Sequence, residues 1–451
     1  MTIETAHPRV GQQAKRALIS GTLGNSIEYY EFSIYGLAAA LVFKDLFFPG
    51  FSATAGTLLS LSTFAIAFIS RPLGSIVLGH FGDKFGRKKT LMFALVLMAS
   101  STVAIGLLPT FSMIGIWAPL LLVVLRLLQG FSLGGEYSGS ILLALEHVRP
   151  GLRGLFSGII TSGLAWGTLL ANALLLALSF LPDDQFLAWG WRIPFLASSV
   201  LFAVTMYLRT KVEESPDFER AAAVRAAENK AAKVPLIELL RHHWKTLLLV
   251  IMTIPGAGGI YYIATVFSLT YATGQLKMDR SAILTAVIAV NIVMIIAMPL
   301  AGWWADRTAN RRRHLLWSFV GMGASAWIWF LLMNTRNVPL MMVGFVIMFI
   351  PFSINYASLP ATFAHAFPPS VRFSGMGTGY NIGSLVGSAF TPMIAASILS
   401  GGGTWHWIAA FMAGSNVVAL VSACFLRERY VNGRETRDAE APQMVPSTTP
   451  V

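Results

Sequence analysis

The chain has very little charge and almost no cysteine for its length. Only 12% of its 451 residues are Asp, Glu, Lys or Arg, whereas 55% are hydrophobic. A soluble domain of that composition would expose large apolar patches to water, so the surrounding solvent is expected to be lipid. The single cysteine, Cys424, excludes a disulfide framework and a cysteine-based metal site.

Enzyme motifs are also missing. The sequence contains no His-Glu-x-x-His, Walker loop, nucleophile elbow or cluster of metal ligands, so we expect no catalytic residue, metal or cofactor. The first apolar segment follows a polar start and lacks a small-residue cleavage site, which indicates a retained helix rather than a signal peptide.

Long apolar segments occupy most of the chain. Each has roughly 20 residues or more, enough to cross a hydrocarbon core of about 30 Å. They predict an all-α, multi-pass protein of the cell membrane with twelve transmembrane helices, at Leu18–Val42, Ala55–Gly79, Thr90–Leu108, Ile116–Ala144, Gly154–Leu181, Trp191–Leu208, Thr246–Ala272, Ala282–Trp304, His314–Met333, Pro339–Ala364, Phe373–Leu399 and Trp405–Leu426.

The basic residues predict the orientation of these helices. The net charge of +12 does not indicate nucleic-acid binding, because the basic residues form short clusters between apolar segments. Most of the 33 Lys and Arg residues fall on the inner side if both termini are cytoplasmic. The outer side keeps Lys44, Arg192, Lys277, Arg280 and Arg336, and the predicted spans contain Arg71 and Arg126.

A polar stretch divides the chain into two similar halves. We expect a cytoplasmic segment (1–17), a six-helix bundle (18–208), a cytoplasmic linker (209–245), a second six-helix bundle (246–426) and a short cytoplasmic tail (427–451). The motif Gly79-x-x-x-Asp83-Lys84 recurs as Gly302-x-x-x-Asp306-Arg307 at the matching place in the second half. Such pseudo-symmetric bundles are typical of transporters that bind their substrate between the halves, near the bilayer midplane.

These motifs resemble the major facilitator superfamily. The loop motif consists of Gly79, Asp83, Lys84, Gly86, Arg87 and Lys88, and its weaker second copy contains Gly302, Asp306 and Arg307. Within that superfamily, the metabolite:proton symporters are similar in the stretches Gly24 to Phe32, Arg71 to Gly74, Arg126 to Glu136, Trp191 to Phe195, Glu214 to Phe218 and Gly377 to Asn381. The chain departs at Tyr29 and Glu31, where that family more often has Trp and Asp. The resemblance implies that the Asp83 loop is a cytoplasmic latch between the halves.

Buried acids and an arginine are the candidate proton-coupling groups. Glu28 and Glu31 share one face of the first helix, where two unpaired carboxylates would be costly. On the fourth helix, Gln129 and Glu136 lie near the same face as Arg126. One interpretation is a structural ion pair between these helices. The other is that protonation of Glu28, Glu31 or Glu136 releases Arg126, with Gln129, to bind an anionic substrate.

Further polar and aromatic positions are candidates for substrate binding. In the first half these are Asn25 and Tyr35, and in the second half Tyr261, Tyr262, Asn291, Asn355, Tyr356 and Asn381. For the tyrosines, packing or an interfacial aromatic belt is an equal alternative. Gly163 and Gly167, four residues apart, would let helices approach closely, either for packing or for rocking.

The sequence therefore predicts a transporter that lies in the lipid bilayer and binds a small-molecule substrate and protons. The leading hypothesis is a monomeric proton symporter of a small organic acid that works by alternating access. A symporter of a proline- or betaine-like zwitterion is the main alternative, and a membrane sensor without transport is the third. Osmosensing is disfavoured because Arg427 to Val451 is short and lacks heptads.

Overall fold

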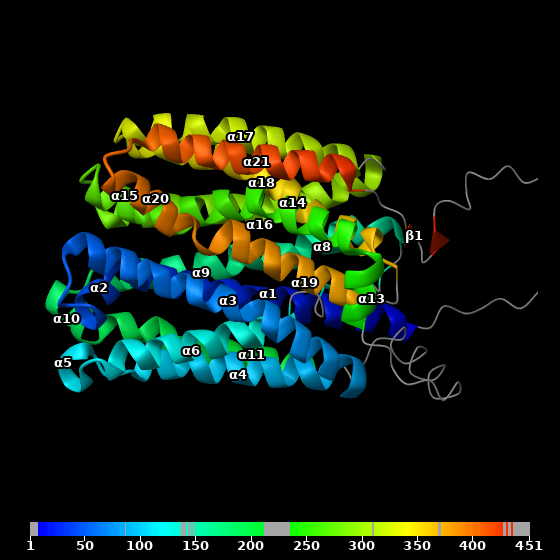
Figure 1. Ribbon diagram of the computed structural model, residues 1–451, viewed down its shortest axis with the longest axis horizontal. Helices are drawn as coiled ribbons and strands as arrows, with labels where there is room; N and C mark the ends of the chain where they lie inside the picture. The colour runs from blue at the N-terminus through cyan, green and yellow to red at the C-terminus, as the bar shows by residue number, and fades with distance from the viewer. Residues whose placement is uncertain are drawn as a thin grey trace, which may run out of the picture.

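The computed structural model describes residues 8–85, 87–136, 141, 142, 145, 148, 150–211, 235–308, 311–368, 371–426, 430, 431, 434 and 435. Long helices lying side by side make up nearly all of this part (Figure 1). Two antiparallel strands of two residues each, β1 (Tyr430–Val431) and β2 (Arg434–Glu435), follow the last helix. The predicted all-α class is confirmed.

The elements of the first half are α1 (Pro8–Leu41), α2 (Phe43–Phe47), α3 (Ala53–Phe85), α4 (Arg87–Leu107), α5 (Phe111–Ile114), α6 (Trp117–Leu133), η1 (Pro150–Leu152), α8 (Arg153–Thr161), α9 (Gly163–Leu178), α10 (Asp183–Ala188), η2 (Gly190–Arg192) and α11 (Ile193–Thr210). Those of the second half are α13 (Pro235–His242), α14 (Trp244–Tyr262), η3 (Ile263–Phe267), α15 (Ser268–Gly274), α16 (Arg280–Thr308), α17 (Arg311–Asn334), α18 (Val338–Ala366), α19 (Arg372–Ser384), η4 (Leu385–Ala389), α20 (Thr391–Ser400) and α21 (Trp405–Phe425).

Ten helical segments in the described part of the chain are long and apolar enough to cross a membrane. α6 is apolar but shorter, with 17 residues, and α1 has 34 residues but carries several polar ones. The count of twelve spans and the cytoplasmic placement of the termini therefore stay predictions. Boundaries differ mainly where a helix continues past its apolar part, as at Pro8, Phe85 and Thr210.

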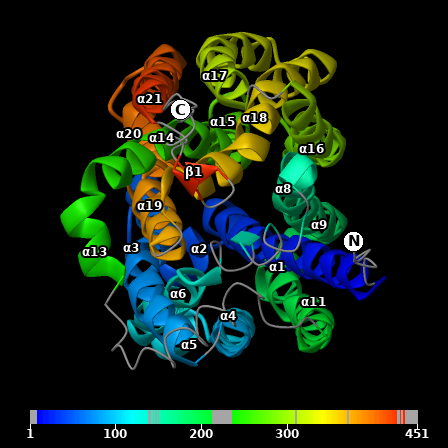
Figure 2. The same ribbon diagram turned by 90° about the vertical axis from the view of Figure 1, so that its right-hand side faces the viewer.

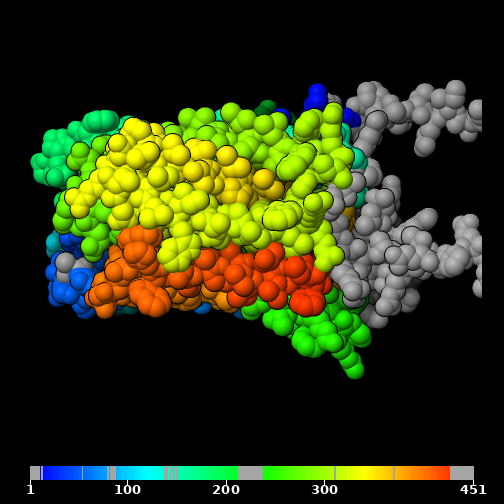
Figure 3. Space-filling view, turned by 90° about the horizontal axis from the view of Figure 1, so that it is seen from above, coloured from blue at the N-terminus to red at the C-terminus, as the bar shows by residue number. Residues whose placement is uncertain are grey.

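The helices form two groups that meet along one interface. α1 packs on α9 and α3 on α6 in the first group, whereas α17 packs on α18 and α14 on α21 in the second. Across the interface, α8 and α9 contact α16, and α3 contacts α19 (Figure 2). Second-half side chains cover most of the face seen in Figure 3.

The bundle has two distinct ends. α2 and α10 lie at one end, called here the α2 end, whereas α13, the start of α1 and β1 lie at the other, called the α13 end (Figure 1). The distribution of basic residues predicts that the α13 end faces the cytoplasm. α13 lies within the range expected as linker, and residues 212–234 of that range are outside the described residues.

Two glycines allow close contact between α1 and α9. A Cβ atom on Gly163 would lie 2.5 Å from the carbonyl oxygen of Thr22, and one on Gly167 would lie 2.1 Å from that of Ser26. Any side chain would push the helices apart, because real Cβ atoms do not approach carbonyl oxygens so closely. The packing interpretation of these glycines is supported.

Candidate functional site

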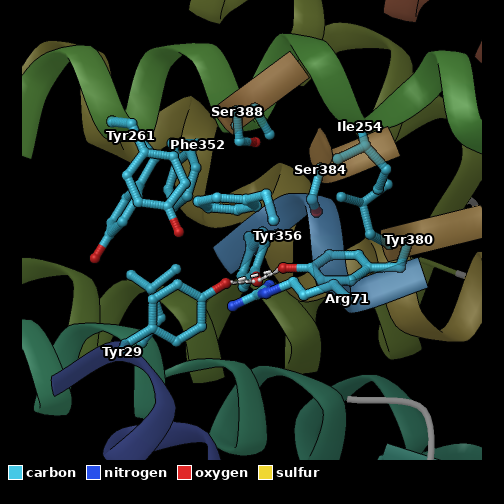
Figure 4. Close-up of a pocket in the computed structure, with 15 residues that line it drawn as sticks. Tyr29, Arg71, Ile254, Tyr261, Phe352, Tyr356, Tyr380, Ser384 and Ser388 are labelled. Atoms are coloured by element: carbon cyan, nitrogen blue, oxygen red, sulfur yellow. Dashed lines mark hydrogen bonds between the residues drawn. The ribbon is translucent and has the colours of Figure 1, made fainter. Parts of the chain in front are cut away.

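A small cavity lies between the two halves, roughly midway along the helices. Its lining comes from both halves and consists of Tyr29, Phe68, Arg71, Leu164, Ile254, Ala257, Gly258, Tyr261, Tyr262, Phe352, Tyr356, Leu359, Tyr380, Ser384 and Ser388 (Figure 4). Side chains fill most of it, and the remaining volume of about 20 Å³ has room for about one water molecule. The site is nearly closed in this structure.

Irregular helix geometry shapes the second-half wall of the cavity. α14 contains Pro255 and continues into the π-helix η3, and α19 continues into the π-helix η4. Such π turns are frequent at functional sites because they turn side chains out of the regular register. Gly258 lets Ser388 approach closely, since a Cβ atom on Gly258 would lie 1.9 Å from Oγ of Ser388.

Arg71 is the one charged residue among those that line the cavity. Its Nη2 donates to Oε1 of Glu28 over 2.9 Å, and each of the two residues is only 2% exposed. The guanidinium also lies 4.3 Å from the ring centre of Phe32 and 4.8 Å from that of Phe68. Its Nε has no hydrogen-bond partner in the described part of the chain. Arg71 is therefore held by one acid and keeps a donor for a ligand.

Three tyrosine hydroxyls meet at the cavity. Tyr29 of α1 shares hydrogen bonds with Tyr356 of α18 and, over 2.9 Å, with Tyr380 of α19. Tyr356 and Tyr380 are themselves 2.9 Å apart, so the hydroxyls form a triangle beside Arg71 (Figure 4). Because Tyr29 belongs to the first half and the others to the second, this triangle joins the halves across the site.

Other polar contacts between the halves surround this triangle. Tyr261 is hydrogen-bonded to Thr168 of α9, which is 3.1 Å from Oγ of Ser33. Asn381 donates to the carbonyl oxygen of Gly134 over 2.9 Å, so this predicted site residue also bridges the halves. Tyr262 lines the cavity and packs edge-on against Phe64 and Phe68.

Four predicted binding residues are buried away from the lining of the cavity. Asn25 donates to the carbonyl oxygen of Ile160 over 2.9 Å, and the hydroxyl of Tyr35 donates to Thr63 over 2.7 Å. In the second half, Asn291 donates to Val287 of its own helix over 2.7 Å, and Asn355 donates to Ser318 over 2.9 Å.

Arg126 occupies a separate buried cluster inside the first half. Its guanidinium donates to Oε1 of Gln129 over 2.7 Å and to the carbonyl oxygen of Phe64 over 3.1 Å, and it lies 3.7 Å from the ring centre of Tyr35. The expected ion pair between Arg126 and Glu28 does not form, because Glu28 binds Arg71 instead. Gln129 in turn donates to Thr102 over 2.6 Å.

Glu31 lies in the same first-half cluster as Arg126. It is fully buried, and neither of its carboxylate oxygens has a hydrogen-bond partner in the described residues. An ionised carboxylate would be costly in such a place, so this acid is suited to carry a proton.

Glu136 pairs with Arg209, a residue that the sequence analysis placed in the linker. The structure corrects this, since Arg209 lies in the last turn of α11 and is 5% exposed. Arg209 also donates to the carbonyl oxygen of Leu91 over 3.1 Å. The sequence signal was weak, because Arg209 follows directly on an apolar segment and could be assigned to either side of the helix end.

Asp306 caps a helix of the opposite half at the α13 end. Its carboxylate accepts from the backbone N–H groups of Gly154 and Leu155 over 2.8 and 2.9 Å, and Arg311 lies 3.5 Å away. Gly302 permits this contact, since a Cβ atom there would lie 2.1 Å from the carbonyl oxygen of Gly154. Arg307, in contrast, is exposed and lies over the ring of Trp303.

The first copy of this motif can be described only in part. Gly86 lies outside the described residues, as do the surroundings of Gly79 and the side chains of Asp83, Lys84 and Arg87. Nζ of Lys88 donates to the carbonyl oxygen of Thr210 over 2.9 Å. The latch assigned to Asp83 stays a prediction.

Comparison with known proteins agrees with this architecture. Residues 22–378 and 249–449 match the Major Facilitator Superfamily. The chain belongs to this superfamily. It is 36% identical to the shikimate transporter of Escherichia coli (strain K12), covering 92% of this chain and 95% of that protein. It is also 31% identical to a glycine betaine/proline/ectoine/pipecolic acid transporter of Dickeya dadantii (strain 3937), covering 92% and 83%.

Solved structures of this superfamily share the fold. A proton:xylose symporter bound to 6-bromo-6-deoxy-D-glucose superposes with a TM-score of 0.74 at 16% identity, covering 96% of this chain and 99% of that one. A xylose transporter from E. coli in a partially occluded inward-open conformation gives 0.71 at 15% identity, covering 92% and 97%. The protein is thus a multi-pass membrane transporter of small molecules and not an enzyme, and its relatives match the predicted metabolite:proton symporters.

Proposed function

We propose that this superfamily member is a proton-coupled symporter of a small organic acid. The observation that supports this most is Arg71, which lines the cavity and is paired with the buried acid Glu28. An arginine fork binds carboxylates with paired hydrogen bonds and stays charged, whereas a carboxylate can take up a proton. A proton on Glu28 would release Arg71 to bind the substrate carboxylate, and loss of that proton inside the cell would return Arg71 to Glu28.

Glu31 is the second proposed proton carrier. Phe32 contacts both buried arginines, since the centre of its ring lies 4.3 Å from the guanidinium of Arg71 and 5.0 Å from that of Arg126. The two arginines therefore share one aromatic neighbour. Movement of Phe32 would change its contacts with both guanidinium groups, which provides a route from the Glu31 cluster to the cavity.

Alternating access is supported by the unequal ends of the interface between the halves. At the α13 end, Asp306 caps α8, and Ser157 donates to the carbonyl oxygen of Ala357 over 2.8 Å. At the α2 end, a cleft of about 420 Å³ separates α3 from α15 and α20, with Thr57, Gln275 and Ser400 in its walls. With the α13 end proposed as cytoplasmic, we infer that this arrangement is an outward-facing state with a nearly closed site.

A zwitterion is the second candidate substrate class. Rings of Tyr29, Tyr261, Phe352 and Tyr356 line the same cavity, and aromatic faces bind quaternary ammonium groups. The relative from Dickeya dadantii is named for such substrates, whereas the relative from Escherichia coli is named for shikimate, a carboxylate.

Counterflow in proteoliposomes distinguishes the two classes. Vesicles with the purified chain are loaded with shikimate, with simple mono- and dicarboxylates, or with betaine and proline, and entry of the labelled compound is measured. Exchange of a carboxylate that lacks an ammonium group supports the organic-acid proposal. Exchange of betaine or proline alone would replace it with the zwitterion proposal.

A further inference from the structure

A groove on the lipid-facing side of the second half has no role in the proposed transport step. It lies between α16 and α18 and has a volume of about 580 Å³. That volume is within the range of small-molecule sites, which is roughly 300 to 1,000 Å³. Its wall is apolar and includes Ile296, Ala297, Leu300, Trp303, Ile350 and Ile354.

Proline residues in both walls give this groove a basis in the sequence. Pro299 lies inside α16 and Pro351 lies inside α18, next to the lining residues Leu300 and Ile350. A proline within a helix removes a backbone hydrogen bond and clashes with the preceding turn, which disfavours a straight helix. The prolines thus lie where a bend in either helix would widen the groove.

A cation and two tryptophans lie at the end of the groove nearest the α13 end. The guanidinium of Arg307 is exposed and lies 4.3 Å from the ring centre of Trp303, and Trp304 stacks on His314 at 4.1 Å. Arg307 forms no ion pair within the described part of the chain, because the neighbouring Asp306 binds the backbone of α8. Tryptophan and arginine are enriched at this level of a bilayer, where headgroups begin.

We propose that the groove binds an anionic phospholipid, with one acyl chain between α16 and α18 and the phosphate on Arg307. The groove is open to the side and apolar, so it suits a hydrocarbon chain and not a soluble anion. The exposed guanidinium supplies charge that a zwitterionic headgroup matches less well. The ligand is thus a membrane lipid with net negative charge.

The position of this site gives the lipid a role in the transport cycle. The opposite side of the same α16 segment packs on α8 at the α13 end. A Cβ atom on Gly158 would lie 2.3 Å from the carbonyl oxygen of Met298, and Asp306 caps Gly154 and Leu155. A lipid behind α16 supports the position that makes these contacts, so it favours the state that is closed at the α13 end.

Native mass spectrometry of the purified full-length protein tests the site. Phosphatidylglycerol and phosphatidylcholine with the same chains are added, and retained lipid is counted. Wild type is expected to retain phosphatidylglycerol preferentially, and Arg307→Gln is expected to bind it roughly fivefold more weakly, as for one basic contact near a bilayer surface. Ala297→Trp fills the groove and should reduce retention of both lipids. Arg336→Gln removes an exposed arginine at the α2 end and serves as the matched control.

Equal retention of the two lipids by wild type would overturn the proposal, as would unchanged retention in Arg307→Gln or in Ala297→Trp. Because Arg307 is exposed, its variant is expected to fold, and the thermal midpoint of each variant is measured in detergent.

The regulatory role of the lipid is tested separately by labelling a cysteine introduced by Ser157→Cys in a Cys424→Ser background. Ser157 is buried in the contact between α8 and α18. Phosphatidylglycerol should slow this labelling when Arg307 is kept but not when Arg307→Gln is added. Equal labelling rates with and without the lipid in the protein that keeps Arg307 would exclude the regulatory role.

Discussion

Arg71 is the residue on which substrate binding is expected to depend most, because it lines the cavity and its Nε donor has no partner among the described residues. Arg71→Lys keeps the positive charge and a partner for Glu28 but removes the planar fork. Affinity for the carboxylate substrate should fall by about 1 to 3 kcal/mol, the loss expected for a charge-assisted hydrogen bond. Isothermal titration calorimetry in detergent measures this change in affinity.

Arg126→Lys is the matched comparison for that variant. The Arg126 guanidinium already donates to Gln129 and Phe64 inside the first half, so its substitution should change folding stability more than affinity. Normal affinity in Arg71→Lys together with lost affinity in a folded Arg126→Lys would assign the substrate anion to Arg126, as the sequence first suggested.

Glu31 should matter for coupling rather than for binding. Glu31→Gln keeps the shape of the side chain and mimics the protonated acid permanently. We expect weak accumulation under a proton gradient but near-normal counterflow, which requires no net proton movement. Uptake by the variant should also depend less steeply on external pH, because Glu28 is then the remaining proposed proton carrier. A variant that accumulates substrate as wild type does would remove Glu31 from the proton pathway.

At the scale of secondary-structure elements, the cap of Asp306 on α8 is the contact between the halves that is easiest to test. Asp306→Asn removes the negative charge that faces two N–H groups at the start of this helix. Caps and helix-terminus charges are worth about 0.5 to 2 kcal/mol each, so the contact at the α13 end should open more often. Labelling of a cysteine at Ser157 should then be faster, whereas Asp279→Asn at the α2 end should leave it unchanged. Equal rates in both variants would argue against a role of the Asp306 cap in closing the α13 end.

Close packing of α1 on α9 gives a prediction on stability. Gly167→Ala should destabilise the protein by about 1 to 3 kcal/mol, the usual cost of overpacking a tight contact. Gly414→Ala is the control, because a Cβ atom at Gly414 would have no neighbour within 4 Å. Thermal unfolding in detergent should show a lower midpoint for the first variant alone. Equal midpoints would mean that the two helices can separate without cost.

The sequence predicted helix positions well because segment length and apolarity determine them. It also singled out Asp306, whose motif has fixed spacing and which caps α8, and Tyr356, which lines the cavity, and their roles in transport stay predictions. It assigned the substrate anion to Arg126, whereas Arg71 lines the cavity, because both lie in apolar spans and only the rotation of each helix directs one of them to the cavity. The triangle of Tyr29, Tyr356 and Tyr380 joins helices that are far apart in the chain, and the π-helices η3 and η4 leave no clear pattern in the sequence.

At the scale of the whole molecule, two helical groups meet at a nearly closed cavity, with contacts at the α13 end and a cleft at the α2 end. The contacts at one end have to break when the other end closes, so the halves are expected to move as bodies around the tyrosine triangle. Protonation of Glu28 is the event that would exchange its bond to Arg71 for one between Arg71 and the substrate.

Proton coupling is tested by measuring proton movement that accompanies substrate uptake. Proteoliposomes with a pH-sensitive dye inside receive the carboxylate identified by counterflow, with and without an imposed inward proton gradient. If the pair of Arg71 and Glu28 couples protons to the substrate, substrate addition acidifies the lumen, the gradient drives accumulation, and Arg71→Gln abolishes both. Accumulation that is equal with and without the gradient, with no acidification of the lumen, would contradict proton coupling through the pair of Arg71 and Glu28.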